Sequence, residues 1–391
     1  MFMQDQDSKY KTDFSKIKPY EEDQIHDALV RILSNPLFQK IIDYIYPTET
    51  HDKLRKDLLT ATTSLEFQKI FMYTGLKSVL KKTTPKGLLF KNEHFITDGR
   101  AVSYISNHRD ILLDSALLQV ILVDLGLETS EISFGNNLIA SDFINDFGRI
   151  NRMFTVFRNG SPRELLQNAK NLSAYIHYTL KEKQRSIWIA HRKGRTKNGL
   201  DKTNLGVIKM LISSSKKSAK EALVSLDIVP ISISYEWEPC DASKVRELYV
   251  NEFGTYIKYP GEDMDSVVKG IIGQKGGIEL AFCKPVNNVL DTFDSTVGNN
   301  PFLNQVVDYI DKQIIENYRL WPSNYYAYDL ANNSNKYVKF YSEETINYFQ
   351  ERLKRAIQLV GEDNQRVREI FIDIYANPVR SKQKMGLLSA Q

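Results

Sequence analysis

The chain has 391 residues, of which 42% are hydrophobic and 26% are charged, and its formal net charge at pH 7 is +4. This composition is typical of a globular protein and excludes a disordered chain, a collagen-like repeat and a disulfide scaffold. The small positive charge is far below that of dedicated nucleic-acid-binding proteins, so we expect no nucleic-acid partner. Cys240 and Cys283 have neither C-x-x-C spacing nor a nearby histidine cluster. We therefore expect no metal site and a reducing compartment.

The N-terminal region is predicted to be helical. Apolar residues repeat with helical spacing over residues 23–46, where Pro36 begins a second short segment, and again over residues 65–80. Residues 1–18 are polar, so we expect no signal peptide. The basic, turn-forming run 81–87 is typical of a boundary, and we expect a helical region over residues 1–84.

Between residues 85 and 290, short apolar runs alternate with helical patterns. The predicted strands are rich in Val, Ile, Phe, Tyr or Trp and span residues 101–106, 131–135, 153–157, 186–190, 228–235 and 278–284. Stretches long enough for crossover helices lie between most of them. The pattern predicts an α/β domain with a largely parallel central sheet flanked by helices. Reactive groups on such a sheet usually lie at the carboxyl ends of the strands.

The last hundred residues, 291–391, are predicted to form a helical region that packs on the α/β domain. Pro301 lies near the start of an apolar-periodic run, where proline is favourable in the first turn. Ser342 is a good N-cap and Gly361 a good helix end. The most apolar stretch, 111–127, contains Asp114, Gln119 and Asp124, so we expect no membrane-spanning helix there.

A histidine directly follows the first predicted strand of the α/β domain. The sequence runs Asn107-His108-Arg109-Asp110 and reaches Asp114 one helical turn later. An imidazole held in one tautomer by a carboxylate is what a general base requires, and either aspartate can supply that carboxylate. The alternative interpretation is that His108 bonds to a loop while Asp110 caps the next helix.

Two cationic, glycine-containing loops follow later strands. Arg158 precedes Asn159 and Gly160, and the other loop contains His191, Lys193, Gly194 and Arg195. Guanidinium groups and backbone amides in such loops are suited to holding a phosphate, although solvated surface loops have a similar composition. The triplets His108-Arg109-Asp110 and Asp146-Phe147-Gly148 occur in protein kinases, but the glycine-rich loop of a kinase is missing upstream, which argues against a kinase.

Taken in order, four segments resemble the blocks of the glycerol-3-phosphate and lysophosphatidate acyltransferase superfamily. That superfamily has a strand ending in Asn-His or a similar pair that opens a His-x4-Asp motif, an apolar block ending in Arg, a Glu-Gly-x-Arg block and an apolar block with a central Pro. The matching segments here are residues 107–114, 154–158, 193–196 and 228–231.

Two departures from that pattern bear on the site. Five residues, not four, separate His108 from Asp114, so the orienting carboxylate is Asp114 with one inserted residue, which we favour, or Asp110. Lys193 replaces the glutamate of the third block. That replacement can alter acceptor preference, strengthen phosphate binding or signal lost activity.

The resemblance implies an acyltransferase that moves a fatty acyl group to glycerol 3-phosphate or lysophosphatidate. His108 would be the base, the acceptor phosphate would lie against Arg158, Lys193, Gly194 and Arg195, and Asn107 and Pro230 would line the acyl or acceptor pocket. The thioester co-substrate would be acyl-CoA or acyl-carrier protein, with no other cofactor. Alternatives are transfer to an aminolipid amine or hydroxyl, and a non-catalytic lipid- or anion-binding relative.

The same reading predicts a cytoplasmic protein that binds the inner face of the cell membrane peripherally. Basic residues that can attract anionic headgroups, or simply solvate loops, are Lys81, Lys82, Lys86, Arg192, Lys197, Lys216 and Lys217.

Overall fold

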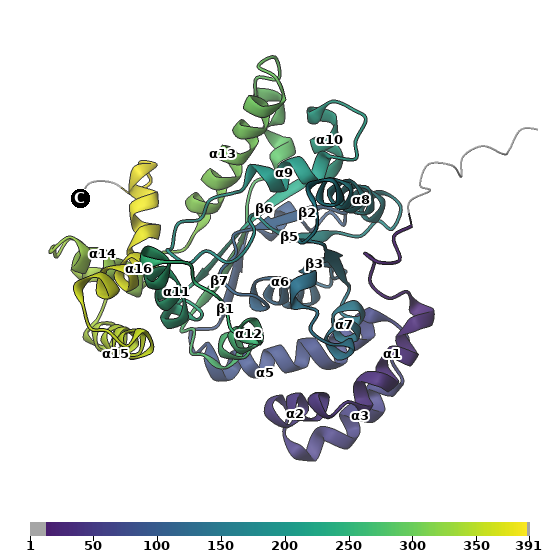
Figure 1. Ribbon diagram of the computed structural model, residues 1–391, viewed down its shortest axis with the longest axis horizontal. Helices are drawn as coiled ribbons and strands as arrows, with labels where there is room; N and C mark the ends of the chain where they lie inside the picture. The colour runs from purple at the N-terminus through teal and green to yellow at the C-terminus, as the bar shows by residue number, and fades with distance from the viewer. Residues whose placement is uncertain (1–12, 389–391) are drawn as a thin grey trace, which may run out of the picture.

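The computed structural model describes residues 13–388, which fold around one seven-stranded sheet (Figure 1). The spatial order of the strands is β1-β7-β6-β2-β5-β3-β4. Their bounds are β1 Leu88–Lys91, β2 Ser103–Ser106, β3 Glu131–Gly135, β4 Met153–Val156, β5 Ile187–Ala190, β6 Ile228–Tyr235 and β7 Ile278–Phe282. Each of the six predicted strands is present, with bounds that differ from the prediction by no more than two residues at either end.

Five neighbouring strands, from β6 across β2, β5 and β3 to β4, run parallel. The predicted α/β class with a largely parallel sheet is therefore confirmed. Two details were not predicted. Strand β7 runs antiparallel to β6, and β1 pairs parallel to β7 at the edge of the sheet. The run that forms β1 has only four residues and directly follows the basic turn 81–87, so its pattern gave no clear strand signal.

Helices cover both faces of the sheet (Figure 1). Their bounds along the domain are α5 Thr74–Thr83, α6 Leu113–Asp124, α7 Asp142–Ile150, α8 Pro162–Lys181, α9 Leu205–Ile212, α10 Ala219–Leu226, α11 Asp241–Phe253, α12 Glu262–Ile272 and α13 Asn299–Asn317. One apolar core joins α5 and α6 to one face of the sheet. A second core joins α8, α9, α10 and α13 to the opposite face. Alternate residues of each central strand serve the two cores, because successive side chains point to opposite faces.

The N-terminal helices pack against α7 in a core of their own. They are α1 Glu22–Ser34, α2 Pro36–Ile45, α3 His51–Leu59 and α4 Ser64–Phe67, followed by a π-helix over Gln68–Tyr73 that leads into α5. Pro36 opens α2 as predicted, and the Asn35 side chain accepts a hydrogen bond from Leu37 N. The segment 65–80, predicted as one helix, is thus helical throughout but contains a π-turn.

The C-terminal helices α14 Pro322–Ala331, α15 Glu343–Val360 and α16 Gln365–Lys384 pack around α11. Ser342 caps α15 through Thr345 N, and Gly361 ends it with φ of 85°, a left-handed conformation that favours glycine. Both features were predicted. The proposed domain limits at residues 84 and 290 stay predictions.

Candidate active site

The loop between β2 and α6 carries the predicted histidine at the carboxyl edge of the sheet. Asp110 in this loop is fully buried, and its Oδ1 accepts hydrogen bonds from Leu112 N at 2.9 Å and Leu113 N at 2.8 Å. It therefore caps the start of α6, as a carboxylate does well at a helix N-terminus. Burial, followed by the nearby charge of Asp114, raises the pKa of Asp110.

Asp114, in the first turn of α6, lies at hydrogen-bond distance from the histidine ring. His108 Nδ1 is 2.9 Å from Asp114 Oδ2. The same oxygen accepts from Arg109 N at 2.7 Å and Asp110 N at 3.0 Å, while Oδ1 accepts from the Tyr235 hydroxyl at 2.8 Å. The buried carboxylate is thus held on both oxygens.

This contact fixes the tautomer of His108. A carboxylate can only accept, so Nδ1 carries the ring proton and Nε2 keeps its lone pair. The side chain is 12% exposed, and its ring lies edge-on to Trp188 with 6.2 Å between centroids. A partly accessible imidazole with a free Nε2 is able to take a proton from a hydroxyl group.

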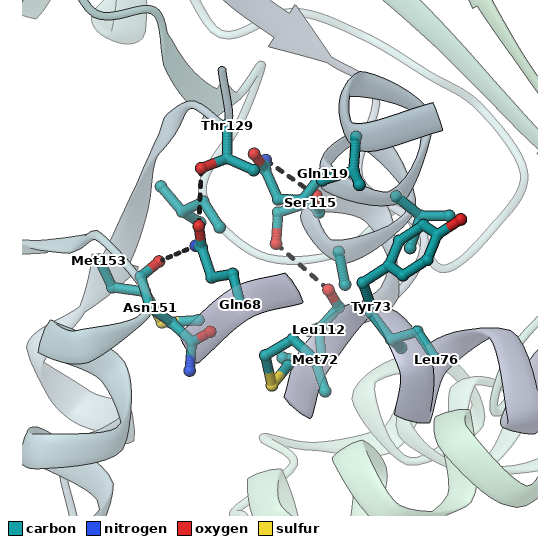
Figure 2. Close-up of a pocket in the computed structure, with 14 residues that line it drawn as sticks. Gln68, Met72, Tyr73, Leu76, Leu112, Ser115, Gln119, Thr129, Asn151 and Met153 are labelled. Atoms are coloured by element: carbon teal, nitrogen blue, oxygen red, sulfur yellow. Dashed lines mark hydrogen bonds between the residues drawn. The ribbon is translucent and has the colours of Figure 1, made fainter. Parts of the chain in front are cut away.

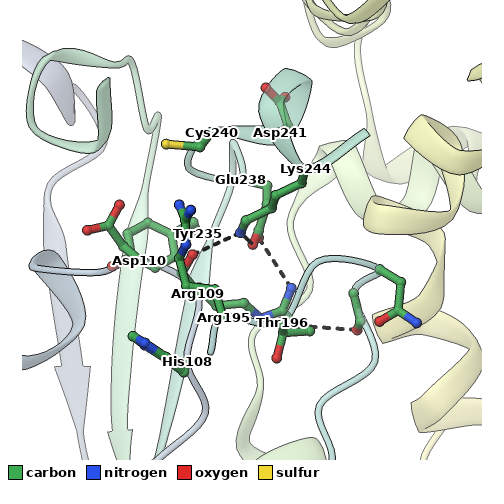
Figure 3. Close-up of polar contacts among 12 residues, drawn as sticks. His108, Arg109, Asp110, Arg195, Thr196, Tyr235, Glu238, Cys240, Asp241 and Lys244 are labelled. Carbon is green, nitrogen blue, oxygen red and sulfur yellow. Dashed lines mark hydrogen bonds and ion pairs between the residues drawn. The ribbon is translucent and has the colours of Figure 1, made fainter. Parts of the chain in front are cut away.

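Beside the histidine lies a buried ionic network (Figure 3). Arg109 is 1% exposed, and its guanidinium binds Asp201 at 2.6 Å and Glu238 at 3.2 Å. Lys244 Nζ also binds Glu238, at 2.5 Å, and the Arg109 carbonyl oxygen at 2.8 Å. These contacts join the loops that follow β2, β5 and β6, so the network fixes the backbone on which His108 sits.

Asn107 and Pro230, predicted to line an acyl or acceptor pocket, lie within the sheet. Asn107 is fully buried and bonds to both the carbonyl and the amide of Ile233 in β6, and to Asp201 at 2.9 Å. Pro230 pairs with Ile105 in the register of β2 and β6. Asn107 therefore ties β2 to β6.

The loop after β5 presents Arg195 beside this site. Its side chain is 9% exposed, Nη2 donates to Ser266 of α12 at 3.3 Å, and Nη1 has no hydrogen-bond partner within residues 13–388. Gly194 has φ of 75°, so the turn that brings Arg195 inward favours glycine. Lys193, by contrast, is exposed. The structure thus brings Arg195, but not the Lys193 side chain, into the protein interior.

Arg158 follows β4, three strands away from β2 in the order of the sheet. Its guanidinium packs on Gly135 at the end of β3, where a Cβ atom would lie 2.9 Å from the guanidinium carbon. Burial lowers the pKa of Arg158, and the charge of Asp263 on α12 opposes that shift. Helix α12 thus faces Arg158 through Asp263 and Arg195 through Ser266, which lie one turn apart.

An apolar cavity of about 360 Å³ lies between α12 and the start of α6. Its walls come from α2, α5, α7, α12, β3 and the residues after His108, and include Ile111, Leu112, Phe134, Phe143, Val267 and Ile271. Ligand pockets occupy roughly 300–1,000 Å³. The cavity, whose lining includes Ile111 three residues after His108, is therefore large enough for an apolar group.

A second, smaller hollow of about 30 Å³ is lined in part by residues of α6 (Figure 2). It shares Leu112 and Ser115 with the larger cavity. Polar side chains at its deep end bond to each other and to backbone: Thr129 to Gln68 at 2.6 Å, and Gln68 to Asn151 O at 3.1 Å. These groups close the apolar space.

The basic residues predicted to form a membrane-facing rim lie on both faces of the sheet. Lys81 and Lys82 end α5, whereas residues 216–217 connect α9 to α10 on the opposite face. Lys86 pairs with Glu236 and Lys197 with Glu247. Within residues 13–388, no helix is both long and apolar enough to cross a membrane, and no cluster of His, Cys, Asp or Glu is arranged to hold a metal ion.

Sequence analysis missed Tyr235, Asp201 and the α12 residues of the site. Tyr235 ends the strand that contains the Ile-Val-Pro-Ile block, and this position at a strand end was the one available signal. Asp263 and Ser266 belong to a helix that no motif connects to the histidine.

Comparison with known proteins places this chain far from characterised sequences. No protein-family model matches it, and no curated protein matches its sequence. Among solved structures, it is similar to the crystal structure of the 1-acyl-sn-glycerophosphate (LPA) acyltransferase, PlsC, from Thermotoga maritima. The match has 13% sequence identity and a TM-score of 0.36, and it covers 75% of this chain and 95% of the other. The geometry of the site itself therefore carries the functional argument.

Proposed function

We propose that this protein is an acyltransferase that moves a fatty acyl group from a thioester to a hydroxyl of glycerol 3-phosphate or lysophosphatidate. The observation that carries the proposal is the contact of 2.9 Å between His108 Nδ1 and the buried Asp114 carboxylate. It leaves Nε2 available as a general base. Ile111 and Leu112, which follow His108 in the same loop, line the apolar cavity, and Arg195 in the loop after β5 has a nitrogen without a partner among the described residues.

The proposed reaction needs one proton relay. His108 Nε2 takes the acceptor hydroxyl proton as the oxygen attacks the thioester carbonyl carbon. The C–S bond then breaks, and the thiolate of coenzyme A or acyl-carrier protein takes the proton from the imidazolium. Asp114 stabilises that imidazolium. General-base help of this kind contributes roughly 10²- to 10⁴-fold, and positioning of the substrates supplies much of the rest.

The two substrate ends have suitable surroundings in the proposed complex. The acyl chain occupies the apolar cavity between α6 and α12. The acceptor phosphate binds Nη1 of Arg195, which has no hydrogen-bond partner among the described residues, with Arg158 beyond it, because a buried guanidinium with an unused donor favours an anionic ligand. Lysophosphatidate and the acylated products lie in membranes, so we propose that the protein works peripherally at the cytoplasmic face of the cell membrane.

The first test is thioester release by the purified full chain with acyl-CoA or acyl-carrier protein as donor. We expect His108→Ala to lower turnover at least about 100-fold because the base is lost. Asp114→Asn should also lower it strongly, since the ring loses its anionic partner. His177→Ala is the matched control, because His177 is similarly buried but lies on α8, on the opposite face of the sheet. Turnover retained in His108→Ala would refute the assigned base.

The second test compares acceptors with one donor. Glycerol 3-phosphate and lysophosphatidate should be used in preference to an aminolipid or glycerol. Preference for an acceptor without a phosphate would overturn the assignment of Arg195. Lipid binding without thioester consumption would instead support a non-catalytic protein.

A further inference from the structure

The carboxylate that contacts His108 has a second partner on a distant strand. Tyr235 is the last residue of β6, is 1% exposed, and donates its hydroxyl to Asp114 Oδ1 at 2.8 Å. In sequence it lies 121 positions from Asp114. The bond spans the gap between the carboxyl end of β6 and the first turn of α6.

We propose that Tyr235 is a positioning residue of the active site: its hydroxyl holds the Asp114 carboxylate with the other oxygen facing His108, and so controls how strongly that carboxylate attracts the imidazole proton. This inference rests on the proposed function, because it assigns a role in general-base catalysis. It adds a third residue to the histidine and aspartate.

The geometry explains why this bond matters to catalysis. Asp114 Oδ2 faces His108 and two backbone amides. Among the described residues, Tyr235 alone donates a hydrogen bond to the other oxygen, Oδ1. Asp114 is fully buried, so water does not replace the phenol. Without the hydroxyl, the carboxylate can rotate about its Cβ–Cγ bond, and its negative charge is shared with one fewer donor.

Tyr235 remains a hydrogen-bond donor throughout the working pH range. Burial and the charges of Asp114 and Asp110 raise its pKa well above 10. The titratable and charged groups around this unit come from every neighbouring loop: Asp110 and Asp114 around α6, Glu238 after β6, and the neutral His191 after β5, with Arg195 facing Asp110.

The decisive experiment measures the pH profile of kcat/KM for Tyr235→Phe with a phosphorylated acceptor. We expect kcat to fall roughly 10-fold because the ring is less well held. We also expect the acid limb of the profile to move to higher pH by about half a unit to one unit, because a carboxylate with fewer donors stabilises the imidazolium more. An unchanged acid limb would overturn the proposal.

The matched control is Tyr175→Phe. The Tyr175 hydroxyl also donates to a buried carboxylate, that of Glu131, at the amino end of β3 and therefore at the far edge of the sheet. Tyr175→Phe, like Tyr235→Phe, removes a donor from a buried carboxylate and should therefore lower stability, but the acid limb of its pH profile should not shift. If both variants lose activity equally and neither profile shifts, Tyr235 is only structural and the inference is wrong.

A second variant tests the same inference if Tyr235→Phe does not fold. Site-specific replacement of Tyr235 by 3-fluorotyrosine keeps the ring and strengthens the phenol as a donor, so the acid limb should move to lower pH. A shift in the same direction as the phenylalanine variant, or no shift, contradicts the inference. His108→Ala separates the two hypotheses. If this variant remains active, the proposed function is wrong. If it is inactive but the acid limb of the Tyr235→Phe profile does not shift, only the inference about Tyr235 is wrong.

Discussion

The loops after β2 and β5 contain the same residue types and use them in opposite ways. After β2, His108 is partly exposed and Arg109 is buried in ion pairs. After β5, His191 is fully buried, whereas Arg195 has a nitrogen without a partner among the described residues. Each loop therefore supplies one structural residue and one residue available to a ligand.

The difference shows that residue type and strand end do not suffice to identify a functional group. Burial drives the pKa of His191 down to about 3, so this imidazole stays neutral. Its Nδ1 lies 3.2 Å from the Thr203 hydroxyl, and no carboxylate oxygen among the described residues lies within hydrogen-bond distance of the ring. His108 differs by its anionic partner and its access to solvent, and these two properties are what a general base needs.

The largest effect should come from replacing Arg109, the one of the two loop arginines that is held in buried ion pairs. Arg109→Met leaves Asp201 and Glu238 as buried charges with one partner fewer, which typically costs about 3–5 kcal/mol. We expect the free energy of unfolding to fall by that amount in urea denaturation. Arg195→Met, at a similarly buried arginine without carboxylate ion pairs, is the control and should cost much less. Equal losses in the two variants would contradict the comparison.

Next in size is the effect of Arg195→Met on substrate use. Loss of a charge-assisted bond to a phosphate should raise KM for the phosphorylated acceptor about 10- to 100-fold. The KM for the thioester should change little. Steady-state kinetics with each substrate varied in turn check this expectation, and an unchanged acceptor KM would exclude Arg195 from the phosphate site.

The effect that is smallest at neutral pH, and grows only on acidification, concerns His191. A histidine whose folded pKa lies below its unfolded value binds more protons when the chain unfolds, so it stabilises the fold fully above about pH 6.5 and loses that contribution as the pH falls toward 3. His191→Gln should therefore flatten the decline of unfolding free energy over this interval. Urea titrations at several pH values test it; an identical slope in both proteins would show that other groups cause the decline.

Much of the architecture was predictable because it rests on local patterns. The predicted bounds of β3 and β6 agree with the structure at both ends, because short stretches of apolar and β-branched residues favour buried strands. Edge strand β1 was missed because its run has only four residues and directly follows the basic turn 81–87; in the structure its Leu89 and Phe90 remain exposed, at 38% and 37%. The antiparallel direction of β7 depends on the path of the chain through α11 and α12, which no local pattern records.

The features of the site also divide into those that the local sequence predicts and those that only the tertiary structure places. The sequence by itself determined that a histidine follows β2 with two aspartates within the next six residues, and that cationic loops follow β4 and β5, because neighbours along a chain stay neighbours in the fold. Tertiary structure decided that Asp114 meets the ring while Asp110 caps α6, that Arg195 rather than Lys193 turns inward, and that Tyr235 and α12 complete the site. Those choices depend on contacts between segments as far apart as 121 positions, and they are set by how helices and strands pack, not by the order of residues within any one of them.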